Sequence, residues 1–391
     1  MPGEVDERDD WPVGLLFSQT GPTAFIEQTQ LNATLLAIEQ INAAGGVRGR
    51  PLRPVIEDPG GDAAAYGVAA DRILDRYPGS VLFGCYMSST RKAVLPVVER
   101  RGALLAYPAP YEGFEYSPNI LYTGAAPNQS IVQLARYLIR HVGRRFYFVG
   151  TRYVFPIEAN RILATLVAER KGQVVAERYV RLDSKRRAFD DIVRDIREKR
   201  PDGIFSTVIG ETAVSFYAAY REAGLDPRDM PIASLTTTEA EVALMGAAVA
   251  EGHITAATYF QSVSTPANTA FVAAYKARFG ADAMTNAMAE SAYFQTLLVA
   301  QAIETVGSQD PGRLRPALLQ AGIAAPQGHV QVDADNNHCW LWPRIGRAEA
   351  SGEFALLEEA SVPVKPDPYM LTHGLDDWGD AARGTPAFQR V

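Results

Sequence analysis

The fold is set out most clearly by residues 80–107, which read SVLFGCYMSSTRKAVLPVVERRGALLAY. A short apolar run, Ser80–Gly84, is followed by a helix-length segment, Ser89–Arg101, and by a second apolar run, Ala103–Ala106. Short apolar runs alternate with helices in proteins whose strands lie parallel and are buried on both faces. The stretch therefore predicts one strand–helix–strand unit of a parallel sheet.

The same alternation continues on both sides of this stretch. Toward the amino terminus, Val13–Phe17 has the length of a strand, and Phe25–Ile41 carries apolar residues at helical spacing. Toward the carboxyl terminus the pattern restarts with a helix at Ser130–His141 and a strand at Arg145–Gly150. Two such series predict an α/β fold with two doubly wound parallel-sheet lobes, whose switch points face a ligand cleft between them.

The length of the chain and its later segments indicate how the lobes are divided. A chain of 391 residues is too long for one ordinary domain, which usually has about 100 to 200 residues. Helices after an apolar run at 253–259 are placed to return to the first lobe, and strand pairs around Gly346 and Gly352 read as antiparallel. We expect the first lobe to comprise residues 1–124 and about 257–330, and the second lobe residues 125–256 and about 331–391, with multiple hinge crossings.

Charge and cysteine content exclude several classes of function. The 38 basic and 45 acidic residues give a net charge of −7, which disfavours direct binding to nucleic acid because such proteins rely on clustered Lys and Arg. Cys85 and Cys339 have no Cys or His neighbours at metal-ligand spacing, so we expect buried thiols rather than a zinc site or a disulfide. We also expect no cofactor. A homo-oligomer is compatible with these features.

The residues at the amino terminus indicate in which cellular compartment the protein is expected. Residues 1–10, MPGEVDERDD, are acidic and polar, whereas a secretory signal starts with basic residues followed by ~7 to 15 apolar ones. No stretch approaches the ~18 apolar residues of a transmembrane helix. We therefore expect a cytoplasmic protein without membrane contact, and a periplasmic protein is the alternative if a signal peptide was removed ahead of this chain.

Signatures of known catalytic sites are absent from the sequence. It contains no GxSxG, HExxH, P-loop or GxGxxG motif, and its five histidines are scattered without metal-ligand spacing. No nucleophile lies beside a base along the chain. We expect a binding protein rather than an enzyme, with an amide-processing enzyme as a less favoured alternative.

Hydroxyl and aromatic side chains follow the predicted strands of both lobes. They are Tyr86, Ser88, Tyr107, Tyr153 and Thr207. Such side chains pair hydrogen-bonding groups with apolar walls, which suits a small neutral polar ligand. A zwitterionic amino acid would instead require buried opposite charges. Each residue also has a structural interpretation, since core tyrosines are common and Ser88 is placed to be a plain helix N-cap.

Basic residues near these strand ends leave the charge of the site open. Arg91, Lys92 and Arg152 lie close to the candidate residues in sequence. Their spacing permits all three side chains to point outward into solvent. These basic residues therefore do not by themselves argue against the neutral ligand that the hydroxyl and aromatic side chains favour.

Two long segments around these residues are similar to a known family. Residues 84–99, GCYMSSTRKAVLPVVE, and 107–119, YPAPYEGFEYSPN, closely resemble the AmiC-type amide sensors, negative regulators of bacterial aliphatic amidase operons. The likeness runs nearly end to end and includes residues 14–18, 58–62 and 232–237. These sensors belong to the urea and short-chain amide branch of proteins that resemble type I periplasmic binding proteins.

The resemblance implies ligand sensing without catalysis. A small aliphatic amide would bind in the cleft and release a bound antiterminator protein, which then acts on leader RNA. The residues that map onto the binding region by resemblance are Tyr86, Ser88, Tyr107, Tyr153, Thr207 and Val208. The alternative within the same branch is the receptor of an ABC importer for urea or short-chain amides.

Two positions depart from the family pattern. In the run Tyr107-Pro108-Ala109, alanine stands where the amide sensors have threonine, and Phe155 stands where they have tyrosine. We therefore add Pro108, Ala109 and Phe155 to the candidate ligand-binding residues. If Ala109 and Phe155 both line the cleft, the pocket is more apolar and slightly roomier, which predicts tolerance for a larger acyl or alkyl group.

Overall fold

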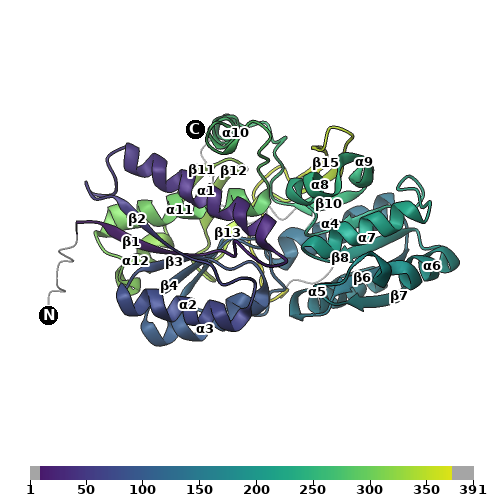
Figure 1. The fold of residues 1–391 in the computed structure, drawn as a ribbon, viewed down its shortest axis with the longest axis horizontal. Coiled ribbons are helices and arrows are strands. Elements are labelled where there is room, and N and C mark those ends of the chain that lie inside the picture. Colours follow the sequence, from purple (N-terminus) through teal and green to yellow (C-terminus); the bar gives the residue numbers. More distant parts are fainter. Residues whose placement is uncertain (1–8, 372–391) are drawn as a thin grey trace.

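The computed structural model describes residues 9–371, which form two α/β lobes (Figure 1). The first lobe is built on a parallel five-stranded sheet with the order β2 (Leu52–Glu57), β1 (Trp11–Leu16), β3 (Val81–Gly84), β4 (Leu104–Tyr107) and β5 (Ile120–Tyr122). Its helices are α1 (Ala24–Ala43), α2 (Ala63–Arg76), α3 (Ser88–Arg101), α10 (Pro266–Phe279), α11 (Ala287–Val306) and α12 (Pro311–Leu318).

Strand β1 shows why the first lobe needs helices on both faces of its sheet. Val13 and Leu15 pack in the cluster that contains α1 and α11 side chains, whereas Leu16 packs with side chains of α2 and α3. In Figure 1, α1 and α11 lie above the sheet and α2 and α3 below it. Gly14 faces the lower layer, where a Cβ would lie 2.5 Å from Leu82 Cδ2, so glycine permits the close packing of that layer.

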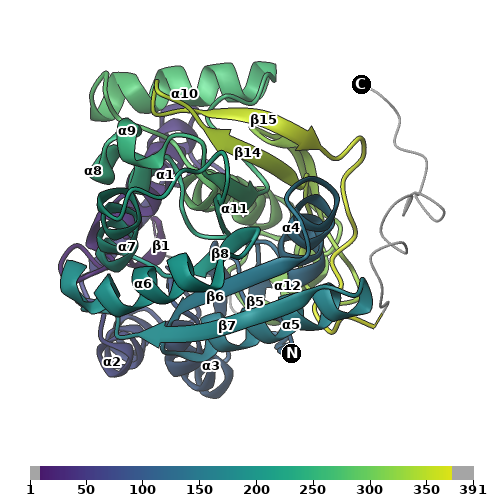
Figure 2. The same cartoon turned by 90° about the vertical axis from the view of Figure 1, so that its right-hand side faces the viewer.

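The second lobe has a seven-stranded sheet, which is mostly parallel. Its order is β15 (Phe354–Glu359), β14 (Arg344–Ala348), β10 (Ile254–Ala257), β9 (Ile232–Ser234), β8 (Gly203–Thr207), β6 (Arg145–Thr151) and β7 (Gln173–Val180). The helical segments are α4 (Pro127–His141), α5 (Val154–Glu169), the 3₁₀ helix at Arg186–Phe189, α6 (Asp190–Lys199), α7 (Glu211–Glu222), α8 (Glu239–Met245) and α9 (Ala247–Ala250). Figure 2 shows β14 and β15 on the opposite side of this lobe from β7. The predicted antiparallel pairing around Gly346 and Gly352 is confirmed, because β14 pairs antiparallel with both β10 and β15.

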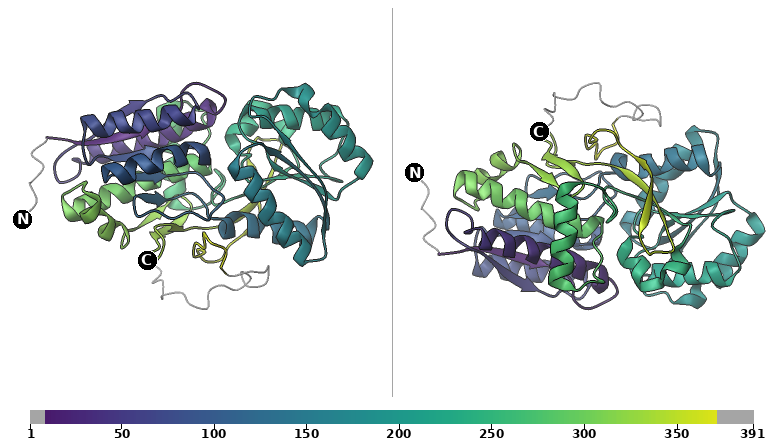
Figure 3. Two further views of the ribbon diagram at one scale, coloured as in Figure 1. Left: turned by 90° about the horizontal axis from the view of Figure 1, so that it is seen from below. Right: turned by 90° about the horizontal axis from the view of Figure 1, so that it is seen from above.

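The chain crosses between the lobes several times, as the two views of Figure 3 show. Helices α10, α11 and α12 return to the first lobe, where α11 packs along α1. A small sheet of β11 (Gly322–Ala325), β12 (Gly328–Val332) and β13 (Cys339–Trp340) follows them. Val332, Cys339 and Leu341 belong to the core of the first lobe. The predicted lobe boundary near residue 330 is therefore too early, because the β12–β13 hairpin still belongs to the first lobe. The parts of the two predicted lobes at residues 1–8 and 372–391 lie outside the described residues.

The architecture confirms the predicted α/β fold with two doubly wound lobes. Cys85 and Cys339 are buried free thiols, as expected, and burial raises the pKa of each. Between residues 9 and 371, no helix combines the length and apolar character needed to cross a membrane.

Buried titratable side chains make the stability of the fold depend on pH. Four glutamates are at most 1% exposed: Glu27, Glu239, Glu241 and Glu290. Burial raises their pKa values from 4.5 to about 7, 8, 7 and 8, respectively. A carboxyl with a higher pKa in the folded chain binds more protons there, so its stabilising contribution falls as the pH rises between the two values. Buried His253 and His338 have the opposite effect on stability, because burial lowers their pKa values from 6.5 to about 3. Their stabilising contribution is lost as the pH falls from 6.5 toward 3.

We therefore expect the thermal unfolding temperature to fall as the pH rises from 6.5 to about 8, where the glutamates dominate. Each carboxyl changes the free energy of unfolding by at most about 1.4 kcal/mol per pH unit. Glu239→Gln should flatten this dependence, whereas Glu169→Gln at an exposed position should leave it unchanged. Calorimetric scans across the pH range measure the effect, and an unfolding temperature that rises over this window would contradict it.

Candidate ligand-binding site

The carboxyl ends of strands from both sheets meet at a cavity between the lobes. Side chains from the first lobe and from the second lobe form its walls, and they are Tyr86, Ser88, Pro110, Met288, Tyr153, Phe155, Ile209 and Thr236. With the lobes closed, the cavity leaves about 10 Å³, which is room for about one water molecule. This arrangement suits a ligand of few atoms that touches both lobes at once.

The structure brings together four of the residues that the sequence predicted. Tyr86, Ser88, Tyr153 and Phe155 line the cavity. Tyr86 and Ser88 follow β3, and Tyr153 and Phe155 follow β6, so the positions are set by the ends of parallel strands that point toward the same cleft. Pro108 lines a neighbouring cavity at the hinge.

The other predicted residues lie behind the cavity wall. The Tyr107 hydroxyl donates to the backbone oxygen of Tyr86 at 2.9 Å, and the Thr207 hydroxyl donates to Asn160 Oδ1 at 3.0 Å. Val208 packs in the core of the second lobe and Ala109 in that of the first. Ala109 therefore does not widen the cavity, because its side chain packs in the core of the first lobe and not in the cavity wall. Phe155 does line the cavity.

Four lining residues were not predicted from the sequence. They are Pro110, Ile209, Thr236 and Met288. Thr236 follows β9, so the strand-end argument could have identified it. Met288 comes from α11, which returns to the cleft from a distant part of the chain and carries no local signal.

A buried ionic cluster centred on Arg91 lies behind Ser88. Arg91 is 0% exposed; its Nε donates to Glu115 Oε1 at 2.7 Å and its Nη2 to Glu112 Oε1 at 3.2 Å. The guanidinium carbon also lies 4.8 and 4.6 Å from the ring centroids of Tyr107 and Tyr111. The sequence left Arg91 free to point into solvent, but the structure buries its side chain, because Glu112 and Glu115 supply partners for its charge.

The same cluster fixes the hydrogen bonding of Ser88. Its hydroxyl donates to Glu112 Oε2 at 2.5 Å and accepts from Arg91 Nη1 at 3.2 Å. With its proton committed to Glu112, Ser88 presents only an acceptor lone pair to the cavity. Ser88 is the first residue of α3 and Met87 is the N-cap, so the N-cap interpretation of Ser88 is off by one position.

Tyr86 supplies the complementary group. Its hydroxyl is buried and has no hydrogen-bond partner among the described residues. Burial, reinforced by the nearby Glu241 carboxyl, raises the pKa of Tyr86 well above its ordinary value, so the hydroxyl keeps its proton and can donate it. An unsatisfied buried hydroxyl is costly and uncommon in native proteins. A ligand acceptor in this cavity would satisfy it.

The cavity wall carries no formal charge. Each of its lining residues is apolar or hydroxyl-bearing, and the nearby charges of Arg91, Glu112 and Glu115 are paired with each other. Although burial acts to raise it, Arg91 and Lys92 hold the pKa of Glu115 at about 2, so that its charge is fixed within the cluster. An isolated charge on a ligand would find no partner on this wall.

The two lobes touch at the rim of the cleft. Glu211 N lies 3.4 Å from the carbonyl oxygen of Pro22, to which it donates across the gap. The preceding residue, Gly210, has φ +65° and ψ −155°, and a Cβ there would lie 2.8 Å from the same Pro22 oxygen. The lobes are therefore closed on each other, and glycine at 210 is what permits this approach.

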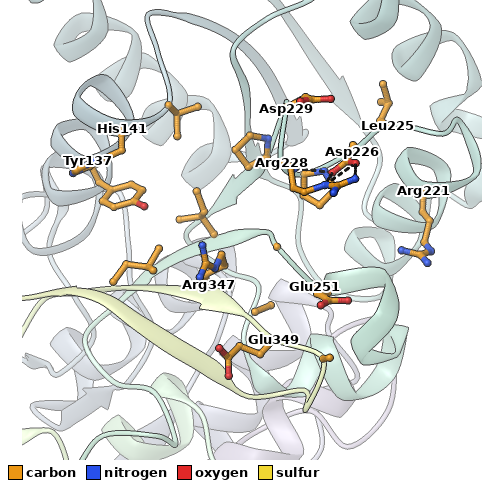
Figure 4. Close-up of a pocket in the computed structure, with 18 of the residues that line it drawn as sticks. Tyr137, His141, Arg221, Leu225, Asp226, Arg228, Asp229, Glu251, Arg347 and Glu349 are labelled. Carbon is orange, nitrogen blue, oxygen red and sulfur yellow. Dashed lines mark hydrogen bonds and ion pairs between the residues drawn. The ribbon is translucent and has the colours of Figure 1, made fainter.

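A separate groove lies on the second lobe (Figure 4). It lies at the opposite edge of the sheet from the cleft, next to the starts of β8, β9 and β10, and Arg228 in its wall pairs with Asp226. Asp202 there accepts hydrogen bonds from the backbone N–H groups of Arg144 and Arg145. These contacts satisfy the charges of Arg228 and Asp202 within the groove wall.

Nothing between residues 9 and 371 gathers three side chains that could hold a metal ion.

Comparison with known proteins agrees with this arrangement. A family model described as the periplasmic binding protein domain matches residues 11–374. The leucine-, isoleucine-, valine-, threonine- and alanine-binding protein of Pseudomonas aeruginosa is 24% identical over 336 residues, which are 83% of this chain and 86% of that protein. A shorter match of 28% identity over 132 residues to limonene hydroxylase of Geobacillus stearothermophilus covers 34% of this chain and 24% of that protein, so the chain spans about a quarter of that relative.

Among solved structures, a solute binding protein of an ABC transporter from Rhodopseudomonas palustris BisB5, in complex with 3,4-dihydroxy benzoic acid, has a TM-score of 0.81. It is 20% identical, and the alignment covers 92% of this chain and 99% of that chain. At this identity the likeness shows the shared fold. These matches do not single out the amide sensors within the wider family. Because the family model spans nearly all of the described residues, the chain belongs to the periplasmic binding protein domain family.

Proposed function

We propose that the protein is a solute-binding receptor that captures a small neutral amide or urea in the cleft between its lobes and serves an ABC importer. The observation that carries this proposal is the uncharged wall of the cleft cavity, in which a lone acceptor, Ser88, and an unpaired donor, Tyr86, occur together. The relatives support the receptor role, since proteins of the same fold and family include solute-binding proteins of ABC transporters.

The pairing of Ser88 with Tyr86 favours an amide over the ligands of those relatives. An amide group has N–H donors for the Ser88 lone pair and a carbonyl acceptor for the Tyr86 hydroxyl. An amino acid or a benzoate would bring charge into a wall that has no unpaired partner for it. The small cavity volume favours a short chain on the amide.

Ligand binding would act by shifting an equilibrium between open and closed lobes. A ligand shifts such an equilibrium only if it binds one state more tightly, so it must contact both lobes. Ser88 and Tyr86 provide the contacts from the first lobe, and Tyr153 and Thr236 provide those from the second. We propose that no chemistry follows, because the Glu112 carboxylate beside Ser88 is already engaged in its ion pair with Arg91. Ammonia release from amide incubated with the protein would overturn this.

Tyr86→Phe tests the proposed donor. We expect affinity for propionamide to weaken by about 0.5–1.5 kcal/mol, because one neutral hydrogen bond is lost. The unliganded protein should keep or gain stability, since the removed hydroxyl has no partner among the described residues. Titration calorimetry and thermal unfolding measure the two effects.

Tyr220→Phe provides the matched control. The Tyr220 hydroxyl donates to the backbone oxygen of Met230 at 2.7 Å, within the second lobe. This variant should lose stability and keep its affinity. If Tyr86→Phe instead destabilises the free protein and binds propionamide normally, the Tyr86 hydroxyl has a structural role and not the one proposed.

A second candidate function is an amide-sensing regulator that releases an antiterminator protein. It is favoured by the resemblance of residues 84–99 and 107–119 to the AmiC-type sensors, because these segments include the lining residues Tyr86, Ser88 and Pro110. Both candidates share the cleft and its ligand, and they differ in partner and compartment. Fractionation of native cells separates them: a receptor is recovered outside the cytoplasm, and a regulator is recovered inside it in an amide-sensitive complex.

A further inference from the structure

A buried carboxyl lies at the junction between the two lobes, outside the wall of the cleft cavity. Glu241 belongs to α8 of the second lobe and is fully buried. Helix α8 packs on α1 of the first lobe: Ala240 contacts the core of that lobe, and Val242 shares a cluster with Ala33 of α1. Because these contacts join the two lobes, opening of the cleft would break them and expose α8 to water.

The closed junction offers little support for a charge on Glu241. Its Oε2 accepts from the backbone N–H and the hydroxyl of Thr238 at 2.8 and 2.5 Å, whereas its Oε1 has no hydrogen-bond partner. No cation among the described residues offsets its burial. A buried carboxylate is costly unless it is paired and hydrogen-bonded. The closed state therefore favours the protonated carboxyl.

The titratable groups around Glu241 are tyrosines and carboxyls. Tyr86 lies near it in the first lobe and Tyr217 on α7; burial raises the pKa of both, and the Glu241 carboxyl adds to each shift. Glu239 on α8 and Glu27 on α1 are buried carboxyls whose own pKa values burial raises. None of these groups would stabilise a negative charge on Glu241 in the closed state.

Helix α1 adds neutral polar atoms to the same junction. Gln30 lies between Ile26 and Ala33, at the i, i+4 and i+7 spacing that shares one face of a helix. It is buried, and neither its Oε1 nor its Nε2 has a partner. A protonated carboxyl both donates and accepts, whereas a carboxylate only accepts. Protonated Glu241 thus suits a junction that contains an acceptor without a donor.

We propose that closure of the lobes is coupled to protonation of Glu241, so that ligand affinity falls as the pH rises. In the closed state, burial raises the pKa of Glu241 from 4.5 to about 7, whereas an open cleft exposes it to water. The closed state binds more protons between these values, so its advantage is present in acid and is lost as the pH rises toward 7. The effect on affinity rests on the proposed function; the effect on closure needs no ligand.

Titration calorimetry on the full chain measures the coupling to binding. Propionamide is titrated in buffers of different ionisation enthalpy, which gives the number of protons taken up. We expect uptake of up to about one proton between about pH 5 and 7, with a dissociation constant that rises by up to about tenfold per pH unit and levels off above about pH 8. Binding without proton uptake anywhere from about pH 5 to 8 would overturn the coupling.

Glu241→Gln locates the effect. Glutamine keeps the size of the side chain and cannot ionise, so the proton uptake should disappear. Glu27→Gln is the matched control, because the Glu27 carboxyl is also buried with a pKa of about 7. Its partners Ser18, Thr23 and Tyr66 all lie in the first lobe, so this variant should keep the uptake. Uptake that survives Glu241→Gln contradicts the assignment.

A measurement without ligand separates the coupling from the proposed function. Single-molecule energy transfer between labels at Ala277→Cys on α10 and Ala188→Cys in the second lobe, both at exposed positions, gives the ratio of closed to open lobes. This ratio should fall by up to about tenfold per pH unit between about pH 5 and 7, and Glu241→Gln should abolish the change. If the ratio changes in this way but no amide binds, the proposed function fails and the coupling stands. If propionamide binds but the ratio is independent of pH, the proposed function stands and the coupling is overturned.

Discussion

Replacing Arg91 by methionine will lower the free energy of unfolding by about 3–5 kcal/mol, the usual cost of removing one partner from a buried ion pair. Arg91 is fully buried, and both Glu112 and Glu115, whose side chains are 3% and 9% exposed, would lose its charge and keep only that of the half-exposed Lys92. The substitution also removes the hydrogen bond from Arg91 Nη1 that helps to position Ser88 and its partner Glu112, so amide affinity should weaken in parallel. Chemical denaturation followed by circular dichroism measures the first effect.

The pH dependence of this loss identifies its cause. In the native protein the pKa of Glu115 is held at about 2, well below its ordinary 4.5. A lowered pKa stabilises the fold above pH 4.5, and this contribution is lost as the pH falls through the folded value. The destabilisation by Arg91→Met should therefore be largest near neutral pH and shrink in acid.

Lys92→Met is the matched control for the buried cation. Its ammonium lies 2.8 Å from Glu115 Oε2, but its side chain is 43% exposed. Removing a partly solvated partner of this kind usually costs about 0–1 kcal/mol. Equal losses in the two variants would contradict the central role of Arg91.

Replacing Gly210 by alanine will weaken amide binding by about tenfold or more, which corresponds to about 1.4 kcal/mol. The added Cβ would lie 2.8 Å from the Pro22 carbonyl oxygen of the other lobe, so it opposes the closed state and not the open one. Because closure provides the contacts from the second lobe, its loss lowers affinity directly. Titration with propionamide measures the change.

Gly224→Ala controls for the backbone strain that accompanies this substitution. Gly224 also has a positive φ, +70°, but a Cβ there meets no atom within 4 Å. Both variants should lose stability from strain of about 1–3 kcal/mol, whereas only Gly210→Ala should lose affinity. If the two variants bind equally well, the contact at Pro22 does not govern closure.

The strand ends of both lobes could be predicted from the sequence because they depend on local patterns. A short apolar run followed by a helix-length segment places Tyr86 and Ser88, or Tyr153 and Phe155, at the carboxyl end of a parallel strand. Parallel sheets bring such ends to one edge, so residues far apart in sequence could be assigned to one cleft.

Features that depend on distant segments could not be predicted in this way. The burial of Arg91 depends on carboxylates from the irregular segment after β4, which has no periodicity to show where Glu112 and Glu115 point. Met288 reaches the cleft only because α11 returns from the far end of the chain to pack on α1. The position of the last hinge crossing depends on the pairing of β12 with β13, which local composition does not reveal.

The uncharged wall of the cleft is tested most directly by titrating the full chain with propionamide, propionate and leucine under identical conditions. We predict one site for propionamide, with propionate and leucine at least tenfold weaker, because the wall has no unpaired charge for a carboxylate or an ammonium. Tighter binding of propionate or leucine than of propionamide would contradict the assignment of a neutral amide to this cleft.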